Sequence, residues 1–196
     1  MRSLRLMFWW SGLLCGGGAL AAPPPAVRVA LLTDCGAIEL ELDAAHAPAT
    51  VANFLHYVDR GLYRDGVFHR TVTPANQPHN LVKIEVIQGG IDPARAREDG
   101  PPIPLERTNR TGLKHCDGTI SMARDGPDTA TSDFFICLGD QPELDFGGHR
   151  NPDGQGFAAF GRVVKGMAVV RRIQQAPADG QTLTPPIKIM RARRLP

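Results

Sequence analysis

Phe68-His69-Arg70 is the first of five short blocks that decide the fold of this chain. The others follow in order: Val86-Ile87-Gln88-Gly89-Gly90, Ser121-Met122-Ala123, Asp133-Phe134-Phe135-Ile136 and Phe160-Gly161-Arg162-Val163. The apolar runs are short, and glycine, proline, asparagine and aspartate bound them. Short strands separated by turn residues are typical of an antiparallel sandwich or barrel. The blocks therefore predict a mostly-β domain.

Two more strands are predicted upstream of these blocks. Val27–Leu32 and Ala37–Leu42 flank a turn at Asp34-Cys35-Gly36. Apolar and polar residues alternate clearly in the second segment and partly in the first, as in strands with one buried face.

Two helices are predicted from apolar residues at helical spacing. Pro48 is suited to the first turn of a helix that runs to about Arg60, and Gly61 is suited to end it. One face of this helix carries Val51, Phe54, Leu55 and Val58. A shorter helix is expected from about Met167 to Gln174, with three buried residues, Val169, Val170 and Ile173.

Two long segments, Asp92–Gly112 and Gly139–Gly156, lack helical periodicity and are expected to be loops. Loops of this length in a compact domain are usually functional or mobile. The chain has no internal repeat and no linker that would divide it, so one domain is expected.

In their order along the chain, the five blocks resemble the cyclophilins, a family of peptidyl-prolyl cis/trans isomerases. The similarity runs from about Val27 to Ile189. It implies a closed eight-stranded antiparallel β-barrel capped by two α-helices, with a substrate groove on its outer wall. It also implies a site without a nucleophile, a metal or a cofactor.

The chemistry that the resemblance implies is rotation about an X-Pro bond. Conjugation of the amide gives this rotation a barrier of about 18–20 kcal/mol. In the twisted state the prolyl nitrogen regains a lone pair, and a fixed donor aimed at it stabilises only the transition state. Arg70 matches the family's catalytic arginine, and its guanidinium supplies rigid, permanently charged donors. The alternative for Arg70 is an ordinary surface ion pair.

The resemblance also assigns the remaining site residues. Gln88 matches a glutamine that holds a substrate carbonyl, and its alternative is a polar residue at a strand end. The substrate-binding positions are Val86, Ala123, Phe135, Leu144 and Phe157. Val86 stands where the family usually has methionine, and Phe135 matches the aromatic at the base of the proline pocket. For Phe135, plain core packing is nearly the same role.

The sequence departs from the family pattern at several places. Glu85 and Glu143 stand where aromatic residues are common, and Asp133 replaces a glutamine, so the groove rim is expected to be more acidic. The interval of 17 residues between Arg70 and Gln88 is longer than in compact members. We expect Glu85 to face solvent with Lys83, and its entry into the groove is the alternative.

Other motifs give little support for different chemistry. His69 should point away from Arg70, because neighbours on a strand face opposite sides. The histidines form no His-x-His or His-x-x-x-His pair, which gives a metal site little support. Ser121 lies outside any Gly-x-Ser-x-Gly elbow, so a serine hydrolase is not expected.

The first residues predict export. Arg2 and Arg5 precede an apolar run, and Ala19-Leu20-Ala21 has the small residues of a cleavage site. We expect a signal peptide at 1–21, a Pro-rich spacer at 22–26, the isomerase domain at 27–190 and a basic tail at 191–196. The expected location is periplasmic, without stable membrane insertion after the leader is removed. A lipoprotein site at Cys15 and an uncleaved anchor are the alternatives.

Charge and cysteine content narrow the partners. The whole chain has 22 basic and 20 acidic residues, and removal of Arg2 and Arg5 leaves 20 of each. This balance argues against nucleic acid as a partner. Three cysteines remain, which allow one disulfide in three pairings. Cys35 and Cys116 are the candidate pair, and Cys137 is expected to be a buried thiol.

The sequence thus predicts a peptidyl-prolyl isomerase that acts on unfolded or extended proline-containing segments of exported proteins. The main alternative is a non-catalytic module of the same fold that binds proline-containing peptides as a chaperone. A plain sandwich domain in an envelope complex is a third possibility, but it leaves the ordered blocks unexplained.

Overall fold

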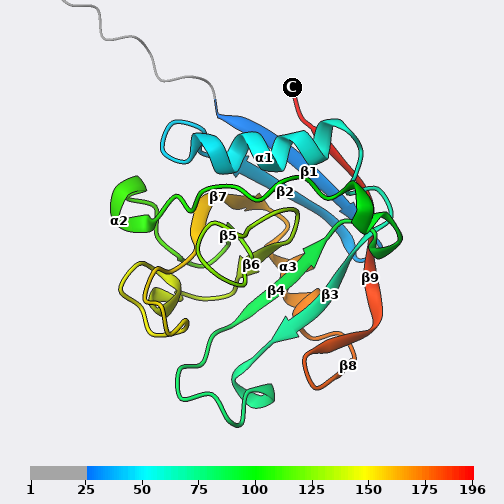
Figure 1. Ribbon diagram of the computed structural model, residues 1–196. Helices are drawn as coiled ribbons and strands as arrows, with labels where there is room; N and C mark the ends of the chain where they lie inside the picture. The colour runs from blue at the N-terminus through cyan, green and yellow to red at the C-terminus, as the bar shows by residue number, and fades with distance from the viewer. Residues whose placement is uncertain (1–25) are drawn as a thin grey trace, which may run out of the picture.

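The computed structural model describes residues 26–196, and the expected signal peptide at 1–21 lies outside the described residues. The described chain forms one nine-stranded antiparallel sheet that is curved into a barrel (Figure 1). Its strands are β1 (Val27–Thr33), β2 (Gly36–Leu42), β3 (Gly66–Val72), β4 (Val86–Gly90), β5 (Thr119–Met122), β6 (Phe134–Cys137), β7 (Ala158–Lys165), β8 (Ala178–Asp179) and β9 (Thr182–Arg194).

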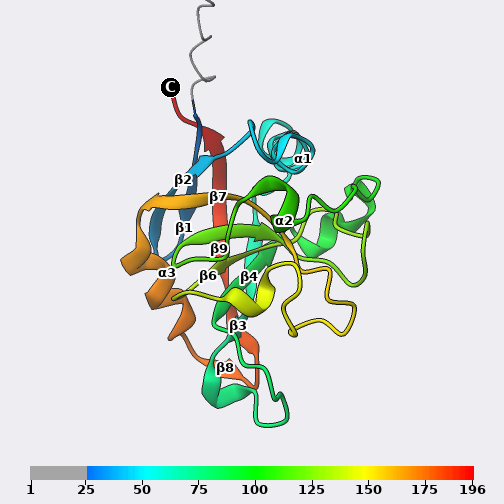
Figure 2. The same cartoon turned by 90° about the vertical axis from the view of Figure 1, so that its left-hand side faces the viewer.

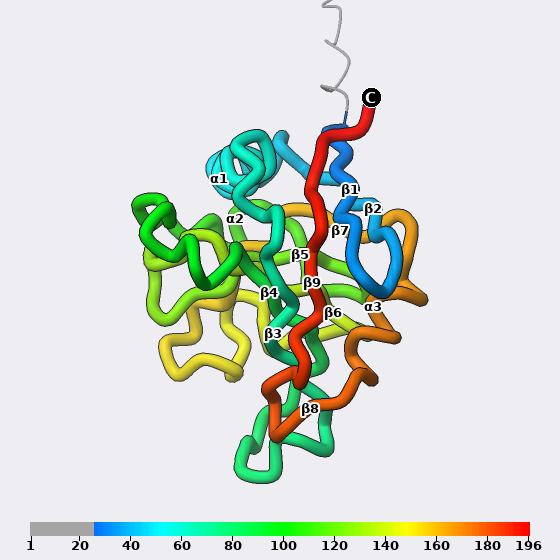
Figure 3. The backbone as a smooth tube through the Cα atoms, turned by 90° about the vertical axis from the view of Figure 1, so that its right-hand side faces the viewer, coloured from blue at the N-terminus to red at the C-terminus, as the bar shows by residue number. Residues whose placement is uncertain are grey.

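The barrel is closed by eight of these strands. Their order is β1-β2-β7-β5-β6-β4-β3-β9, and β9 pairs again with β1, while the two-residue strand β8 pairs only with β9. In Figure 3, β9 lies beside both β1 and β3, and the C-terminus comes close to the start of β1. Closure pairs what would otherwise be sheet edges, so the expected eight-stranded barrel is confirmed.

Both expected helices are present. Helix α1 (Pro48–Asp59) begins at its proline, and Gly61 follows with a positive φ of 64°. It lies across one end of the barrel, whereas α3 (Met167–Gln174) packs against β2, β3 and β4 (Figure 2). In α3, Val170 and Ile173 are buried as expected, but Val169 is only partly buried at the edge of the core.

The barrel interior is a continuous hydrophobic core. Phe54 of α1 packs against the rings of Tyr63, Phe134 and Phe160 at centroid distances of 5.2–5.6 Å. Aromatic pairs at such distances add to the stabilisation from burial. This core fixes the inward side of each strand, so the alternate residues must face the outer wall.

Three segments differ from expectation in the structure: the C-terminal tail and the two long loops. Residues 191–194 of the expected basic tail belong to the barrel, because β9 continues to Arg194 and its end pairs with β1. Arg194 also forms an ion pair with Asp59 of α1. The two long loops contain helical turns too short to show a periodicity: η2 (Pro93–Glu98), α2 (Thr108–Thr111) and η3 (Pro142–Leu144). A further turn, η1 (Pro74–Asn76), lies between β3 and β4.

Candidate functional site

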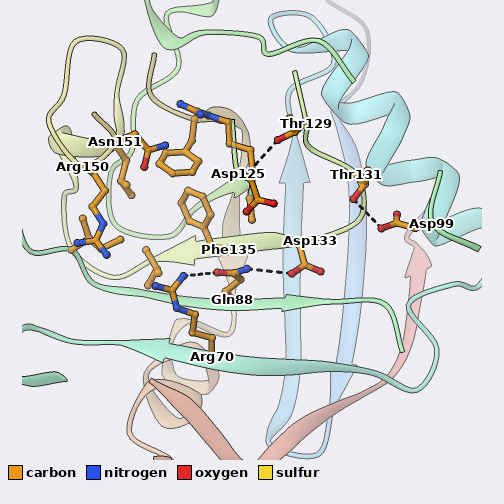
Figure 4. Close-up of a pocket in the computed structure, with 16 residues that line it drawn as sticks. Arg70, Gln88, Asp99, Asp125, Thr129, Thr131, Asp133, Phe135, Arg150 and Asn151 are labelled. Atoms are coloured by element: carbon orange, nitrogen blue, oxygen red, sulfur yellow. Dashed lines mark hydrogen bonds between the residues drawn. The ribbon is translucent and has the colours of Figure 1, made fainter. Parts of the chain in front are cut away.

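The seven residues that the sequence predicted for the site lie together. They line one pocket of about 490 Å³ on the outer wall of β3, β4 and β6. Arg70 lies on β3, and Val86 and Gln88 on β4, with Phe135 on β6. Figure 4 shows Arg70, Gln88 and Phe135 around the same space. The lining includes Arg70, Val86, Gln88, Ala123, Phe135, Leu144 and Phe157.

Arg70 is held by two glutamines. Its Nε and Nη2 donate to Oε1 of Gln181 at 2.9 and 2.7 Å, and its Nη1 donates to Oε1 of Gln88 at 2.9 Å. Gln88 in turn donates from Nε2 to Oδ2 of Asp133 at 3.2 Å. Burial lowers the pKa of Arg70, yet a guanidinium remains charged at any working pH. The guanidinium is therefore a fixed cation at the pocket wall.

A β-bulge changes the direction of His69. Phe68 pairs with Gly89 and Arg70 with Gln88, so His69 has no partner of its own on β4. At such a bulge two successive residues face one residue of the opposite strand, and the usual alternation fails. His69 Nε2 lies 3.6 Å from Asp133 Oδ2, on the carboxylate that also binds Gln88. The expected strict alternation of His69 and Arg70 is therefore lost at this bulge, although His69 is not among the residues that line the pocket.

The pocket floor is an apolar cluster separate from the barrel core. Phe135 meets the ring of Phe157 edge to face at 5.2 Å, and Leu144, Val86 and Ile84 pack in the same cluster. The guanidinium of Arg124 lies over the ring of Phe157, 5.1 Å from its centroid. A small apolar ring such as that of proline would be desolvated there.

Glu85 does not line the pocket. Its Oε2 accepts a hydrogen bond from Nε2 of Gln174 in α3 at 3.1 Å, so its partner is not Lys83. Its neighbour Ile84 lines the pocket instead and supplies an apolar surface. Glu143 also stays off the pocket wall, because its carboxylate accepts from the backbone N–H of His149 at 2.8 Å. Of the three acidic departures, only Asp133 lines the groove.

Sequence reasoning missed Arg150, Asn151 and Gln181. Arg150 and Asn151 line the pocket from the loop between η3 and β7, and Gln181 orients Arg70 from the turn between β8 and β9. These segments lie far from Arg70 along the chain. The only local signal was the length of the 139–156 loop, which indicates function without indicating a residue.

A Ser-His-Asp arrangement lies under the pocket. His115 Nε2 is 3.0 Å from Ser121 Oγ, and its Nδ1 is 2.8 Å from Asp145 Oδ1. However, Ser121 and His115 are 0% and 2% exposed, and the imidazole stacks under Phe135 at 5.9 Å. Burial raises the pKa of Asp145, but hydrogen bonds from His115 outweigh it and leave the pKa below its usual value. A substrate cannot reach this serine, so the three residues support the pocket floor.

The described cysteines are unpaired. Cys35, Cys116 and Cys137 have free thiols, so the candidate pair Cys35–Cys116 does not form in the structure. Burial raises the pKa of the Cys137 thiol well above its ordinary range, which makes it unreactive. Within residues 26–196, three or more potential metal ligands do not gather anywhere. No helix in this part of the chain is both long and apolar enough to span a membrane.

The structure defines a closed β-barrel protein with a groove on its outer wall, and comparisons identify the family. Residues 28–194 match the family model described as cyclophilin type peptidyl-prolyl cis-trans isomerase. Peptidyl-prolyl cis-trans isomerase A of Dickeya dadantii is 38% identical over 161 residues, which cover 81% of this chain and 76% of that protein. Peptidyl-prolyl cis-trans isomerase-like 1 of Neurospora crassa is 40% identical over 173 residues, which cover 86% of this chain and 94% of that protein.

A solved structure shows the same fold. The cyclophilin type peptidyl-prolyl cis-trans isomerase of Cryptosporidium parvum superposes with a TM-score of 0.70 at 24% identity, over 87% of this chain and 98% of that one. The chain belongs to the cyclophilin-type peptidyl-prolyl cis-trans isomerase family. It is a peptidyl-prolyl cis/trans isomerase, as the sequence predicted.

Proposed function

We propose that Arg70 is the catalytic residue of this isomerase and that it donates a hydrogen bond to the prolyl nitrogen of the twisted amide. The observation that carries the proposal is the clamp of Gln88 and Gln181 on its guanidinium, beside an apolar pocket. A donor held in place before the substrate binds stabilises the transition state without reorganisation. Both planar isomers lack the nitrogen lone pair, so they gain less from the same donor.

Gln88 has a second role in this proposal. Its amide oxygen is used by Arg70, and one amide hydrogen is used by Asp133. An amide NH₂ has two hydrogens, so one remains for a substrate carbonyl. Phe135, Leu144 and Phe157 would hold the proline ring, with Val86 and Ala123 at the sides. The apolar floor fixes the ring while the preceding carbonyl rotates.

The test is an isomerisation assay on a proline-containing peptide with Arg70→Ala beside the parent protein. It also tests the alternative of a binding module without catalysis. A non-catalytic module would bind the peptide and leave the exchange rate unchanged in both proteins. The catalytic role requires acceleration by the parent that the variant largely loses, with peptide binding retained.

We also propose that the protein acts in the periplasm on unfolded or extended segments of other exported proteins. The support is the charged start, apolar run and Ala19-Leu20-Ala21 of the leader, which lie outside the described residues. Uncatalysed X-Pro exchange takes tens of seconds or more, slow enough to limit the folding of such clients. The mature chain would start at Ala22, with the spacer 22–26 before β1.

A further inference from the structure

Two guanidinium groups line the groove without a carboxylate partner. Arg70 is bound by the neutral amides of Gln88 and Gln181. Arg150 donates from Nη1 to Oε1 of Gln77 at 2.9 Å and to the carbonyl of Val82 at 2.8 Å. Neither arginine forms an ion pair within residues 26–196, whereas Arg124 in the same lining pairs with Asp153 at 2.7 Å.

Arg150 is held in place by the long segment between β3 and β4. Gln77 is 1% exposed, and its Nε2 donates to the carbonyls of Thr73 and Ile84 at 2.8 and 2.7 Å. Its Oε1 therefore presents a fixed acceptor to Arg150. Burial lowers the pKa of Arg150, and the nearby charge of Arg70 adds to this effect. Two cations close to each other, partly buried and unneutralised, favour an anion between or beside them.

The other end of the groove is acidic. Asp99, Asp125 and Asp133 line it, and Figure 4 shows them on the far side of Phe135 from Arg150. Asp99 is engaged by the hydroxyls of Tyr57 and Thr131 at 2.6 and 2.9 Å. The carboxylate of Asp125 forms no hydrogen bond or ion pair in the described part of the chain, and only its backbone N–H is engaged, by Thr129.

We infer that this charge separation selects substrates: the groove prefers a proline flanked by an acidic residue on the Arg150 side and by a basic residue on the side of Asp125 and Asp133. The inference rests on the proposed function, because it places the proline ring on Phe135 between the two ends. Attraction between opposite charges at a partly buried surface exceeds that in bulk water. A peptide with the reverse order brings like charges together at both ends.

The experiment compares three peptides that share one alanyl-proline centre. The first has neutral residues on both sides. The second has glutamate before and lysine after the proline, and the third has the same residues exchanged. We expect kcat/KM to be higher than for the neutral peptide with one charged peptide and lower with the other. The two charged peptides should differ from each other by about 3–10-fold. The difference should shrink at high salt, because salt screens exposed charges.

Variants show which residues cause the charge preference at each end of the groove. Arg150→Ala should remove the effect of the acidic residue, Arg150→Glu should reverse it, and Arg150→Lys should retain part of it. Asp125→Asn should weaken the effect of the basic residue. Arg193→Ala is the matched control, because it removes an exposed arginine from a different surface of the barrel. Each variant is checked for folding by its thermal transition.

Equal kcat/KM for both charged peptides with the parent protein would overturn the inference. So would a charge preference that Arg150→Glu leaves unchanged in a folded protein. Loss of activity on the neutral peptide in Arg70→Ala concerns the proposed catalysis alone. If the parent isomerises no peptide, the proposed catalysis fails, and direct binding of the same three peptides by calorimetry still decides the charge preference.

Discussion

Oε1 of Gln88 lies 2.9 Å from Nη1 of Arg70 and accepts its hydrogen bond, while Nε2 of Gln88 donates to Asp133. This contact links two adjacent strands at a β-bulge, which places His69 and Arg70 opposite a single residue of β4. The guanidinium is thereby oriented before any peptide arrives. Orientation in advance distinguishes a catalytic arginine from a mobile surface arginine.

Arg70→Ala should lose about 10²–10³-fold in kcat/KM, the range found when one preorganised donor is removed. Arg70→Lys should also be impaired, because an ammonium does not reproduce the two-sided contact with Gln88 and Gln181. Exchange of a proline peptide measured by NMR or a coupled assay checks this. A folded Arg70→Ala protein with the parent's activity would contradict the mechanism.

Gln181→Ala should lower kcat by about 10–150-fold and leave KM nearly unchanged, since the loss of a hydrogen bond to a charged group costs about 1.5–3 kcal/mol. The glutamine positions Arg70 and does not line the pocket. The measurement is the separate determination of kcat and KM. Gln175→Ala, outside the site, serves as the control, and an effect on KM alone would show that Gln181 contacts substrate instead.

Phe135→Ala should destabilise the fold by about 3–5 kcal/mol and also reduce activity. Phe135 is buried and contacts both Phe157 and the supporting His115, so its removal leaves a cavity under the proline pocket. Denaturant unfolding gives the first quantity and the isomerisation assay the second. A variant as stable as the parent would show that this ring is not part of the packed floor.

Asp133→Asn should maintain or increase stability at neutral pH. Burial raises the pKa of Asp133 above 3.8, and the nearby Asp99 and Asp125 add to this, while His69 and Gln88 oppose it. Because the folded state holds the proton of Asp133 more tightly than the unfolded state, the neutral carboxyl adds to the free energy of unfolding. This contribution is complete below the unfolded-state pKa and is lost as pH rises through the higher folded-state pKa. Unfolding free energies measured from pH 3 upward should therefore fall less in the variant than in the parent.

Asp153→Asn is the control, because its effect on the pH dependence of stability should have the opposite sign to that of Asp133→Asn. The hydrogen bond from Arg124 lowers the pKa of Asp153, so its charged form stabilises the fold at neutral pH and this contribution is lost as pH falls. The effect should be small, because the pair is partly exposed. If Asp133→Asn behaves in the same way as Asp153→Asn, the carboxylate of Asp133 is stabilised and not penalised by its surroundings.

Protein purified from the cell envelope should have the mass of a chain that begins at Ala22. The leader has the charges, apolar run and small residues of a cleaved signal. Intact-mass measurement decides this, with an Ala21→Pro variant, expected to block cleavage, as the control. A full-length mass that stays with membranes after a salt wash would show that the leader is an anchor.

The sequence by itself determined the local structure and seven of the sixteen residues that line the pocket. Strands β1 and β2, both main helices and the seven pocket residues could be predicted, because each depends on a short window or a family block. Alternation, helical spacing, an initial proline and a terminating glycine are local signals. These signals show which side of a strand or helix is buried. In a strand, the remaining residues must then face the outer wall, where the pocket lies.

Only the tertiary structure decided which partners those residues meet. Gln181 reaches Arg70 from 111 positions away, and Gln77 holds Arg150 across 73 positions. Barrel closure brings these segments together, and no local period encodes it. Side chains alternate in direction along a regular strand, but the bulge at His69 breaks this alternation. Glu85 bonds to Gln174 of α3, and its neighbour Ile84 lines the pocket. The direction of each of these side chains depends on hydrogen bonds and packing with residues that are distant in the sequence, and a local pattern does not contain that information.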